Sequence, residues 1–493
     1  MKKTYLIVVL HFFLMKGQAQ IWSALTQKNS IYSTISNPAF ATYTKNELDL
    51  NIFAIGANVS NNGLAWSAPF SVNDMFLKKV GNQYKNSNGK LAFTKKWITN
   101  VSNDKPTDVY IDYEVLGPTF LYRINKKNVI GGGTRKRIIG SVTNIDSRLI
   151  KIVLSGIDST DKNNIFNNPD GSIKLGDNLS KINFNVNAIA YQEYFVSFSR
   201  LLFEKGKKSL SAGLTSKFLT SSGYIHTGGN DFGIQLFGFD SLKLNALKFA
   251  YNYSNLKSLK QFNANPFLSG TSIKNNGLSF DVGGCYQLKN KKIDSTDNEY
   301  KLSIGFSISD IGFIKVTKEI KSFNISTNNP ITIVPEDILN LILTNGFQSE
   351  ETQSYFDSIT KLFDVKKNYI LTKTIYTPAM FNLNVDYSIT KHIYISYLMS
   401  QNILNRKNSE NIIRQSYMSL IPSFRSNDFG LSLPFTLAQD YKRFDLGLQA
   451  SYGPLMIGTN SLKPMIRKNN YTNYQIYFGL HLYLKSFKKK SNK

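Results

Sequence analysis

Residues 474–485, Tyr-Gln-Ile-Tyr-Phe-Gly-Leu-His-Leu-Tyr-Leu-Lys, alternate between two kinds of side chain along their whole length. Successive side chains of an extended strand point to opposite faces, so this segment predicts a strand with one apolar face. A tilted strand crosses a membrane with about 9–11 residues, and this run is long enough. The apolar face carries Tyr474, Ile476, Phe478, Leu480, Leu482 and Leu484, and the other carries Gln475, Tyr477, Gly479, His481, Tyr483 and Lys485.

The same alternation recurs along the chain, at residues 182–190, 278–288, 302–309, 381–389 and 444–452. The second face of these segments is mostly Ser, Asn, Gly and Gln with isolated carboxylates. A soluble β-sandwich also alternates, but its strands are usually about 5–6 residues long. Its water-facing side would also carry more Lys and Glu. The pattern therefore predicts a transmembrane antiparallel β-barrel, in which one face meets lipid and the other meets the lumen.

Further candidate strands bring the total to about 14, with roughly 12 to 16 allowed by uncertain boundaries. The predicted fold class is all-β, a barrel over residues 46–486 with a small helical insert. The further candidates are residues 47–57, 62–70, 109–124, 128–143, 208–222, 231–240, 243–254, 392–402, 412–422 and 427–436.

The first 19 residues have the features of a cleaved signal peptide. Lys2 and Lys3 precede an apolar run from Tyr5 to Met15, and small residues follow, with cleavage expected after Ala19. The apolar run is shorter than the roughly 20 residues of a spanning helix, and no later segment reaches that length. Export without helical spans is compatible with the periplasm, the exterior or the outer membrane, and the strands favour the outer membrane of a Gram-negative bacterium.

Residues 20–45 precede the first clear strand and contain Pro38, which fixes φ and indicates a turn. This N-terminal segment could enter the lumen as a plug or remain a periplasmic tail, and the residues do not decide between the two. The last residues, 487–493, form a basic tail that we expect to be solvated.

Residues 335–364 break the β pattern. Pro335 could start a helix, and apolar residues follow at helical spacing in two pieces. This insert could cap the barrel mouth, line the lumen, meet a partner or simply pack on the barrel rim. The candidate gate or partner residues are Ile338, Leu341, Ile342, Phe356, Ile359 and Phe363.

The formal charge is +26, from 59 Lys and Arg against 33 Asp and Glu. The lysines lie mostly in turn-like stretches such as Lys126-Lys127, which suits anionic lipid headgroups or a solvated surface. Because export removes most contact with nucleic acid, no nucleic-acid partner is expected. Cys285 is the lone cysteine, and the four histidines have no ligand-spaced partners. We therefore expect no catalytic residues, metal site or cofactor.

Charged and amide side chains on the faces assigned inward are candidate lumen-lining residues. An Arg or Lys side chain that faces lipid at the midplane costs about 2–4 kcal/mol of free energy, so we assign these charges to the lumen. With both signs present, we predict that these charges pair across the lumen and partly close it. The candidates are Asp112, Glu114, Arg135, Arg137, Asp281, Asn382, Asn384, Asp386, Asp445 and Gln449.

The order and spacing of several segments resemble a family of uncharacterised outer-membrane β-barrels from type IX-secreting bacteria, similar in plan to FadL and PorV. The matching segments are Ser36-Asn37-Pro38-Ala39, Thr134-Arg135-Lys136-Arg137, residues 277–284 followed by 309–314, and Thr377-Pro378-Ala379-Met380-Phe381. Many outer-membrane barrels end on an aromatic residue, whereas this chain continues past Phe487 into the basic tail. The resemblance implies a FadL-like barrel of about fourteen strands and carries no substrate.

These observations lead to a non-enzymatic outer-membrane barrel that moves a hydrophobic or small amphipathic compound, in the manner of FadL or PorV. The alternative is a sealed barrel anchor whose loops dock secretion or motility components. A passive porin is a third, weaker interpretation, because its lumen should be openly polar. The expected partners are outer-membrane lipid, a hydrophobic ligand and, in the alternative, a secretion or motility protein.

Overall fold

The computed structural model describes most of the chain between residues 31 and 485. The described residues are 31–44, 46–76, 78–85, 97–102, 105–150, 178–236, 242–245, 248–254, 275–289, 300–326, 331–333, 365–406, 408, 410–426, 429–466 and 469–485. The signal peptide, the helical insert with its gate residues and the basic tail lie outside these residues.

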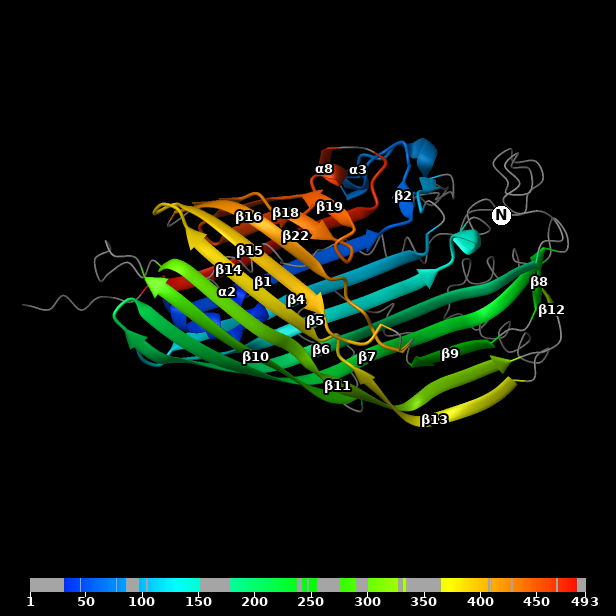
Figure 1. Ribbon diagram of the computed structural model, residues 1–493, viewed down its shortest axis with the longest axis horizontal. Coiled ribbons are helices and arrows are strands. Elements are labelled where there is room, and N and C mark those ends of the chain that lie inside the picture. The colour runs from blue at the N-terminus through cyan, green and yellow to red at the C-terminus, as the bar shows by residue number, and fades with distance from the viewer. Residues whose placement is uncertain are drawn as a thin grey trace, which may run out of the picture.

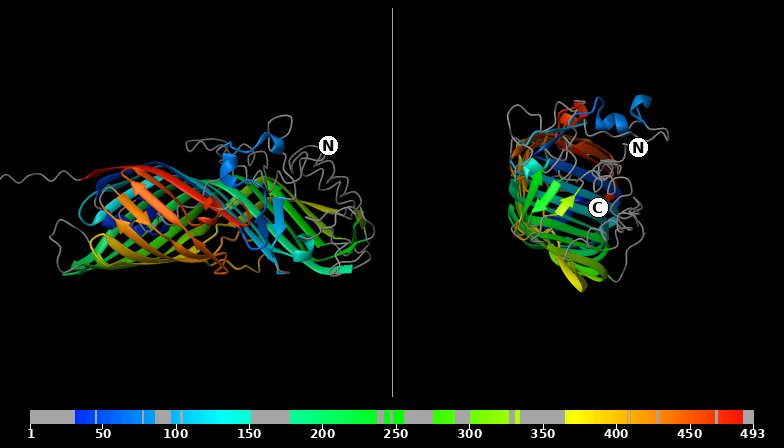
Figure 2. Two further views of the ribbon diagram at one scale, coloured as in Figure 1. Left: turned by 90° about the horizontal axis from the view of Figure 1, so that it is seen from above. Right: turned by 90° about the vertical axis from the view of Figure 1, so that its right-hand side faces the viewer.

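The chain forms a closed antiparallel β-barrel of 14 strands (Figures 1 and 2). The barrel closes where β22 pairs with β1, in a register that places Ile55 opposite Phe478. This confirms the fold class predicted from the alternation. Around the wall the order is β1 (Asn46–Asn61), β4 (Thr107–Arg123), β5 (Asn128–Ile145), β6 (Asn178–Lys205), β7 (Lys208–Leu236), β10 (Asn276–Lys289), β11 (Tyr300–Ser326), β14 (Met380–Ser388), β15 (Ile393–Asn402), β16 (Tyr417–Arg425), β17 (Phe429–Ser432) with β18 (Phe435–Ala438), β19 (Arg443–Leu446) with β20 (Leu448–Tyr452), β21 (Leu455–Thr459) and β22 (Asn473–Lys485).

Some wall strands are interrupted where the backbone cannot continue the ladder. Pro434 separates β17 from β18, and its carbonyl accepts a hydrogen bond from the Gly447 N–H at 2.8 Å. Pro378 separates β13 (Val365–Tyr376) from β14, and both of these strands pair with β11. Because proline has no N–H to donate, each interruption falls where a ladder bond would be missing.

The wall continues beyond the membrane at one end. β6 and β7 have 28 and 29 residues, far more than a crossing needs. Past the end of β10, β9 (Lys248–Ser254) pairs with both β7 and β11, while β8 (Leu242–Asn245) pairs with β7 and β12 (Ile331–Ile333). At the opposite end, tight turns join β4 to β5 and β6 to β7, which marks that end as periplasmic by the usual barrel habit.

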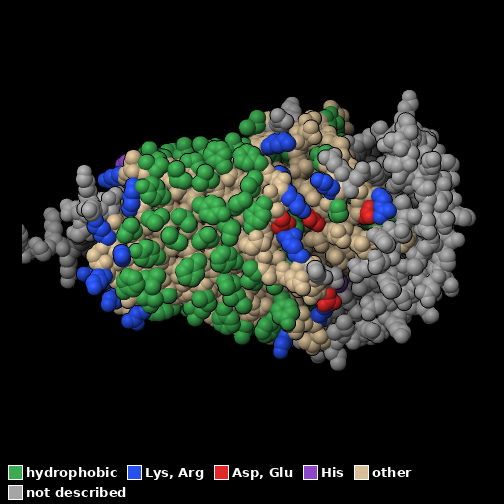
Figure 3. Space-filling view, in the orientation of Figure 1, with side chains coloured by type: hydrophobic (Ala, Val, Ile, Leu, Met, Phe, Trp, Pro, Cys, Tyr) green, Lys and Arg blue, Asp and Glu red, His purple; other side chains and the backbone are tan. Residues whose placement is uncertain are grey.

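Apolar side chains cover the wall of the barrel on the face seen in Figure 3 and form an apolar belt. It consists of exposed side chains such as Phe306, of which 54% is exposed, Val282 and Ile457. Their strand neighbours Ser307 and Asp281 are buried inside. This is the two-faced surface of a membrane-spanning strand, apolar toward lipid and polar toward the lumen.

Short helices and one small sheet complete the described structure. Outside the barrel, β2 (Leu64–Trp66), β3 (Ile98–Asn100), α3 (Val72–Phe76), η3 (Asn82–Tyr84) and α8 (Lys463–Ile466) surround an aromatic cluster that contains Trp66, Phe70, Trp97 and Tyr474. No helix within the described residues is long and apolar enough to span a membrane.

Some predicted strands differ from the structure. The described parts of residues 208–222 and 231–240, predicted as two strands, belong to the single strand β7, and those of 243–254 form the two short strands β8 and β9. Two further segments are not strands of the wall. Residues 62–70 do not join the wall, because β2 leaves it to pair with β3. Residues 412–416 are not a strand but the end of a loop that connects β15 to β16. Each segment contains apolar residues at suitable spacing, but these pack in the external aromatic cluster or inside the barrel instead of facing lipid.

Candidate functional site: the closed lumen

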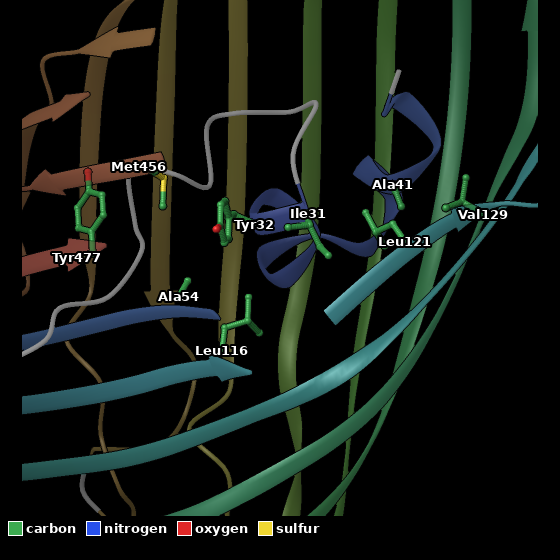
Figure 4. Packing of buried hydrophobic residues seen from close by; sticks show 9 residues of the cluster. All are labelled: Ile31, Tyr32, Ala41, Ala54, Leu116, Leu121, Val129, Met456 and Tyr477. Carbon is green, nitrogen blue, oxygen red and sulfur yellow. The ribbon is translucent and has the colours of Figure 1, made fainter. Parts of the chain in front are cut away.

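The N-terminal segment of residues 31–44 lies inside the periplasmic half of the barrel (Figure 4). It consists of α2 (Ile31–Ser36) and η2 (Pro38–Tyr43). Asn37 joins the two helices, and its Oδ1 caps η2 by accepting from the Ala39 N–H at 3.0 Å. Its Nδ2 donates to the carbonyls of Gly284 and Phe306, both at 3.1 Å. One side chain therefore fixes the segment's own turn and attaches it to β10 and β11.

Glycines of the wall make room for this segment. A Cβ on Gly283 would lie 2.1 Å from the Asn37 Oδ1, and one on Gly213 would lie 2.5 Å from the Pro38 carbonyl carbon. Gly305 faces the Phe40 ring in the same way, at 2.5 Å. Gly213 and Gly283 are paired across β7 and β10. We call Gly213, Gly283 and Gly305 the glycine socket.

Wall side chains donate hydrogen bonds to the segment's backbone. The Ser199 and Ser211 hydroxyls donate to the carbonyls of Pro38 and Ala39 at 2.6 and 3.0 Å, and Ser307 donates to that of Ser36. Arg123 donates to the Thr42 carbonyl at 2.9 Å near the end of η2. These bonds satisfy carbonyls that a short helix leaves unpaired.

An apolar cluster completes this closure, and Figure 4 shows its members. Ile31 and Tyr32 of α2 lie among side chains of β1, β4, β5, β21 and β22, and the Tyr32 hydroxyl donates to the Asn51 Oδ1 at 3.0 Å. On the other side of the segment, Ala39 and Phe40 pack with Cys285. The N-terminal segment thus contacts the wall on several sides.

A network of buried charges occupies the next level of the lumen. Arg135 makes a bidentate pair with Glu193, at 2.8 and 3.1 Å, and Arg137 bridges Glu193 and Asp310 at 3.2 and 2.8 Å. Lys217 lies 2.6 Å from both Asp281 and Asp310. These strands, β5, β6, β7, β10 and β11, are neighbours or near neighbours, so the network follows the inner wall. We call these residues, with Glu114, Asp112 and Arg414, the ionic network.

Asp310 is central to the network because its backbone turns the carboxylate inward. Its φ is +60°, a conformation that Asp tolerates better than most residues. Its N–H donates to the Asp281 Oδ1 at 2.7 Å, and its carbonyl accepts from the Thr377 hydroxyl at 2.6 Å. The bulge in β11 therefore places one carboxylate within 4 Å of four cations.

The loop formed by residues 403–406, 408 and 410–416 enters the lumen from the outer end and reaches the opposite wall. Arg414 donates through Nε to the Asp112 Oδ2 at 2.7 Å and lies 3.7 Å from Asp310. The Asn411 carbonyl accepts from the Asn187 amide at 3.2 Å, and the Ile413 N–H donates to the Ser141 hydroxyl at 3.3 Å. We call this segment the inward loop.

Beside the ionic network, an apolar cluster fills the lumen around Ile412 of the inward loop. The members come from β5, β6, β7, β11 and β13, so side chains from much of the wall meet one residue of the loop. We call this set the central apolar cluster: Ile139, Ile189, Tyr191, Leu219, Tyr224, Ile314, Val316, Ile375 and Ile412. A cavity of about 10 Å³ remains between the loop and β1, β4 and β16, which is room for about one water.

The predicted lumen residues all have buried side chains, and the structure groups some of them. Asp112, Glu114, Arg135, Arg137 and Asp281 belong to the ionic network. Asp386 forms a separate pair with Arg425 at 2.9 Å, and Asp445 pairs with Arg443 at 2.9 Å.

The predicted amides are distributed around the wall. Asn382 donates to the Ser309 hydroxyl at 3.1 Å and accepts from Ser400 at 2.7 Å. Gln449 accepts from the Tyr477 hydroxyl at 3.4 Å, and the Asn384 amide has no hydrogen-bond partner among the described residues.

Sequence reasoning missed Glu193, Lys217, Asp310 and Arg414. The alternation of β6 continues past residue 190 in phase, so extending it by three positions would have placed Glu193 inward. Lys217 lies on the polar face of a predicted strand, so the same alternation would have placed it inward. Asp310 and Arg414 gave no such signal, because one depends on a bulge and the other on a loop that folds inward.

Comparisons with known proteins identify the family. Residues 38–460 match a family described as "Family of unknown function (DUF5723)". The chain belongs to this family. A comparison with curated proteins gave no match. Within the described residues, no three His, Cys, Asp or Glu side chains are grouped so as to hold a metal ion.

Solved structures that match include bacterial outer-membrane channels. The Ralstonia pickettii toluene transporter TbuX is 10% identical with a TM-score of 0.39, covering 96% of this chain and 100% of that one. The Pseudomonas putida toluene transporter TodX is 9% identical with a TM-score of 0.38, covering 92% and 94%. A Pseudomonas aeruginosa FadL homologue is 11% identical with a TM-score of 0.29, covering 92% and 93%.

Proposed function

We propose that this protein is an outer-membrane channel for small hydrophobic or amphipathic compounds, which its own chain holds closed. The belt and the two-faced strands support the membrane location. The N-terminal segment, acting as a plug, and the inward loop both cross the lumen and are held by non-covalent contacts. Such contacts, at about 0.5–1.5 kcal/mol for each hydrogen bond, can be exchanged for a passing molecule.

The observation that carries the proposal is the central apolar cluster. A passive porin keeps a polar, water-filled lumen. Here nine buried residues, six of them Leu, Ile or Val from the wall, meet in the middle of the barrel. A molecule that follows this path must replace apolar side chains, which favours an apolar solute over an ion or a sugar. No catalytic step is part of the proposal.

The test uses the single native thiol. Ala39 packs with Cys285, so Ala39→Cys gives a protein with two neighbouring cysteines, one on the N-terminal segment and one on the wall. Cells with a lipopolysaccharide outer leaflet would express this variant, and entry of N-phenyl-1-naphthylamine, a hydrophobic dye, would be followed by its fluorescence. Mass spectrometry would establish that the disulfide has formed.

Wild-type protein should speed dye entry over cells without it, oxidation of Ala39→Cys should suppress that gain, and a reductant should restore it. Ala39→Ser under the same oxidant is the matched control and should behave as wild type. Unchanged entry through the cross-linked protein would contradict a role for the N-terminal segment in gating. No entry through any form would favour the sealed anchor for secretion or motility components.

Maturation is a separate part of the proposal. Cleavage after Ala19 would leave Gln20 as the first residue, about ten residues before the described part of the N-terminal segment. Sequencing of the mature N-terminus from isolated outer membranes tests this directly, and a start other than Gln20 would contradict it.

A further inference from the structure

Ile412 occupies the lumen as an apolar side chain supplied by a loop. It is fully buried, with 0% of its surface exposed, among Ile139, Ile189, Leu219, Ile314, Val316 and Ile375. Those wall residues belong to regular strands, whereas Ile412 belongs to a segment without strand pairing. We call the apolar surface that these six wall residues form around Ile412 the seat. The side chain that fills it, Ile412, is connected to the wall only through the inward loop.

Polar groups around this seat are buried without partners. The hydroxyls of Tyr191 and Tyr224, whose side chains are 1% and 0% exposed, make no hydrogen bond with any described residue. The Nε and Nη2 groups of Arg137 are likewise buried and make no hydrogen bond with any described residue. Arg137 lies 5.7 Å from the centre of the Tyr191 ring. Buried polar groups in native proteins almost always have partners. An isoleucine cannot provide one, but a ligand with an acceptor atom could.

The charge of the ionic network limits what this ligand can be. Arg135, Arg137, Lys217 and Arg414 face Glu114, Glu193, Asp281, Asp310 and Asp112, which is four cations against five carboxylates. An additional anion would add a sixth negative charge to a buried site. A neutral acceptor, such as a ketone, ether or ester oxygen, avoids that cost.

The inward loop can leave without disturbing the wall. Its nearest attachments on either side of Ile412 are the hydrogen bonds to Asn187 and Ser141, the Glu410 pair with Lys373, and the pairs of Arg414 with Asp112 and Asp310. All of these involve wall side chains, so releasing them breaks no bond between strands.

We propose that the seat of Ile412 is the ligand site of the channel, occupied by the protein itself when closed. It takes a small, neutral, apolar molecule with one hydrogen-bond acceptor. The apolar part replaces the Ile412 side chain, and the acceptor faces Tyr191, Tyr224 and Arg137. This inference rests on the proposed function and names its substrate class.

Cyclohexanone, which is apolar with one carbonyl acceptor, is the probe, and binding is measured on purified protein by equilibrium dialysis against matched detergent. Ile412→Ala empties part of the seat and should bind the probe about 10-fold or more tightly than wild type, because the ligand no longer displaces a buried aliphatic side chain. Ile413→Ala is the matched control. Ile413 is the next residue and is also buried, but it lines the small cavity instead of the central apolar cluster.

Two further variants address the acceptor and the fold. Tyr191→Phe and Tyr224→Phe are each made in the Ile412→Ala background. If the removed hydroxyl donates to the carbonyl of the probe, the affinity for cyclohexanone should fall by about 2- to 10-fold, while the affinity for methylcyclohexane should not change. If Ile412→Ala does not retain the heat-modifiable mobility of a folded barrel, Ile412→Cys replaces it. Its buried thiol should react slowly with a membrane-impermeant maleimide and faster when cyclohexanone is present.

The proposed site is overturned if wild type, Ile412→Ala and Ile413→Ala bind cyclohexanone equally well. It is also overturned if the labelling rate of Ile412→Cys does not change when cyclohexanone is added. These measurements need no transport and are therefore distinct from the dye assay. Binding at the seat without dye entry would leave the site standing and reject the channel. Dye entry without binding at the seat would support the channel and reject the ligand site.

Discussion

The lumen is closed at two levels by different chemistry. In the periplasmic half, the N-terminal segment is a separate piece of chain, held mostly by uncharged hydrogen bonds: wall serines donate to its backbone carbonyls, and its Asn37 amide donates to wall carbonyls. In the middle, the ionic network consists mostly of side chains of the wall strands themselves. The first closure can be removed as a unit with the wall intact. The second opens only if buried ion pairs separate, so we expect the two levels to respond to different perturbations.

The largest expected effect is on the ionic network. Arg137→Ala leaves Glu193 and Asp310 with one buried cation fewer, and breaking a buried pair in this way costs about 3–5 kcal/mol. The free energy of unfolding, measured by urea titration in lipid vesicles, should fall by that amount. A loss below about 1 kcal/mol would mean that the carboxylates are solvated, contrary to their burial.

The double variant Arg135→Ala, Arg137→Ala extends this to function. Removing both arginines should raise ion conductance in planar bilayers, because the pairs that hold the lumen closed are lost. The oxidised Ala39→Cys protein in the same background is the informative control, since it retains the periplasmic closure. Because the N-terminal segment still closes the periplasmic half, the decisive comparison adds Gly283→Val, which expels that segment. If the double variant with Gly283→Val conducts no more than Gly283→Val alone, closure by pairing is rejected.

A steric change tests the removable closure. Gly283→Val places a side chain where Asn37 now lies, 2.1 Å from a Cβ, and should expel the N-terminal segment at a cost of about 1–3 kcal/mol. Limited proteolysis from the periplasmic side should then cut residues 31–44 faster. Gly140→Ala is the control, because its nearest neighbours would be 3.6 Å from the new Cβ. Equal protection of both variants would show that the socket does not hold the segment.

A milder change removes attachment without adding bulk. Asn37→Ala loses the cap on Ala39 and two bonds to the wall, worth about 1–3 kcal/mol together. The same proteolysis should show partial release while the unfolding midpoint of the barrel hardly moves. Thr34→Ala loses only a bond within the segment, to the Ile31 carbonyl, and should remain protected. A large shift in barrel stability would contradict the view that this segment is separable.

The smallest effect is expected outside the lumen, where an ion pair is partly solvated. The Arg148 guanidinium, hydrogen-bonded to Asp146, lowers the pKa of that carboxyl. Its stabilisation is therefore present above the ordinary pKa of Asp and is lost as the pH falls through the lowered value. Arg148→Ala should cost less than about 1 kcal/mol at neutral pH, and nothing in acid. A loss as large as that of Arg137→Ala would remove the contrast between buried and exposed pairs.

The alternation of side chains determined the barrel. Segments such as 474–485 have a period of two with one face that is apolar apart from the Tyr474 hydroxyl, and such a face is suited to a lipid environment. The same rule assigned Arg135, Arg137 and Asp281 to the inside, because a strand offers only two faces. Local sequence also sufficed for the turn at Asn37-Pro38, where the cap and the fixed φ are properties of neighbouring residues.

Only the tertiary structure decided what fills the lumen. The partners of Arg135 come from β6 and β11, strands whose register with β5 no local pattern specifies. The alternation placed residues 412–422 in a strand, yet Ile412 belongs to a loop whose place depends on the opposite wall. Periodicity reports which way a side chain points within its own strand. Which side chains meet across a closed barrel depends on strand order, register and loops that fold inward, and these are set by contacts between residues far apart in the chain.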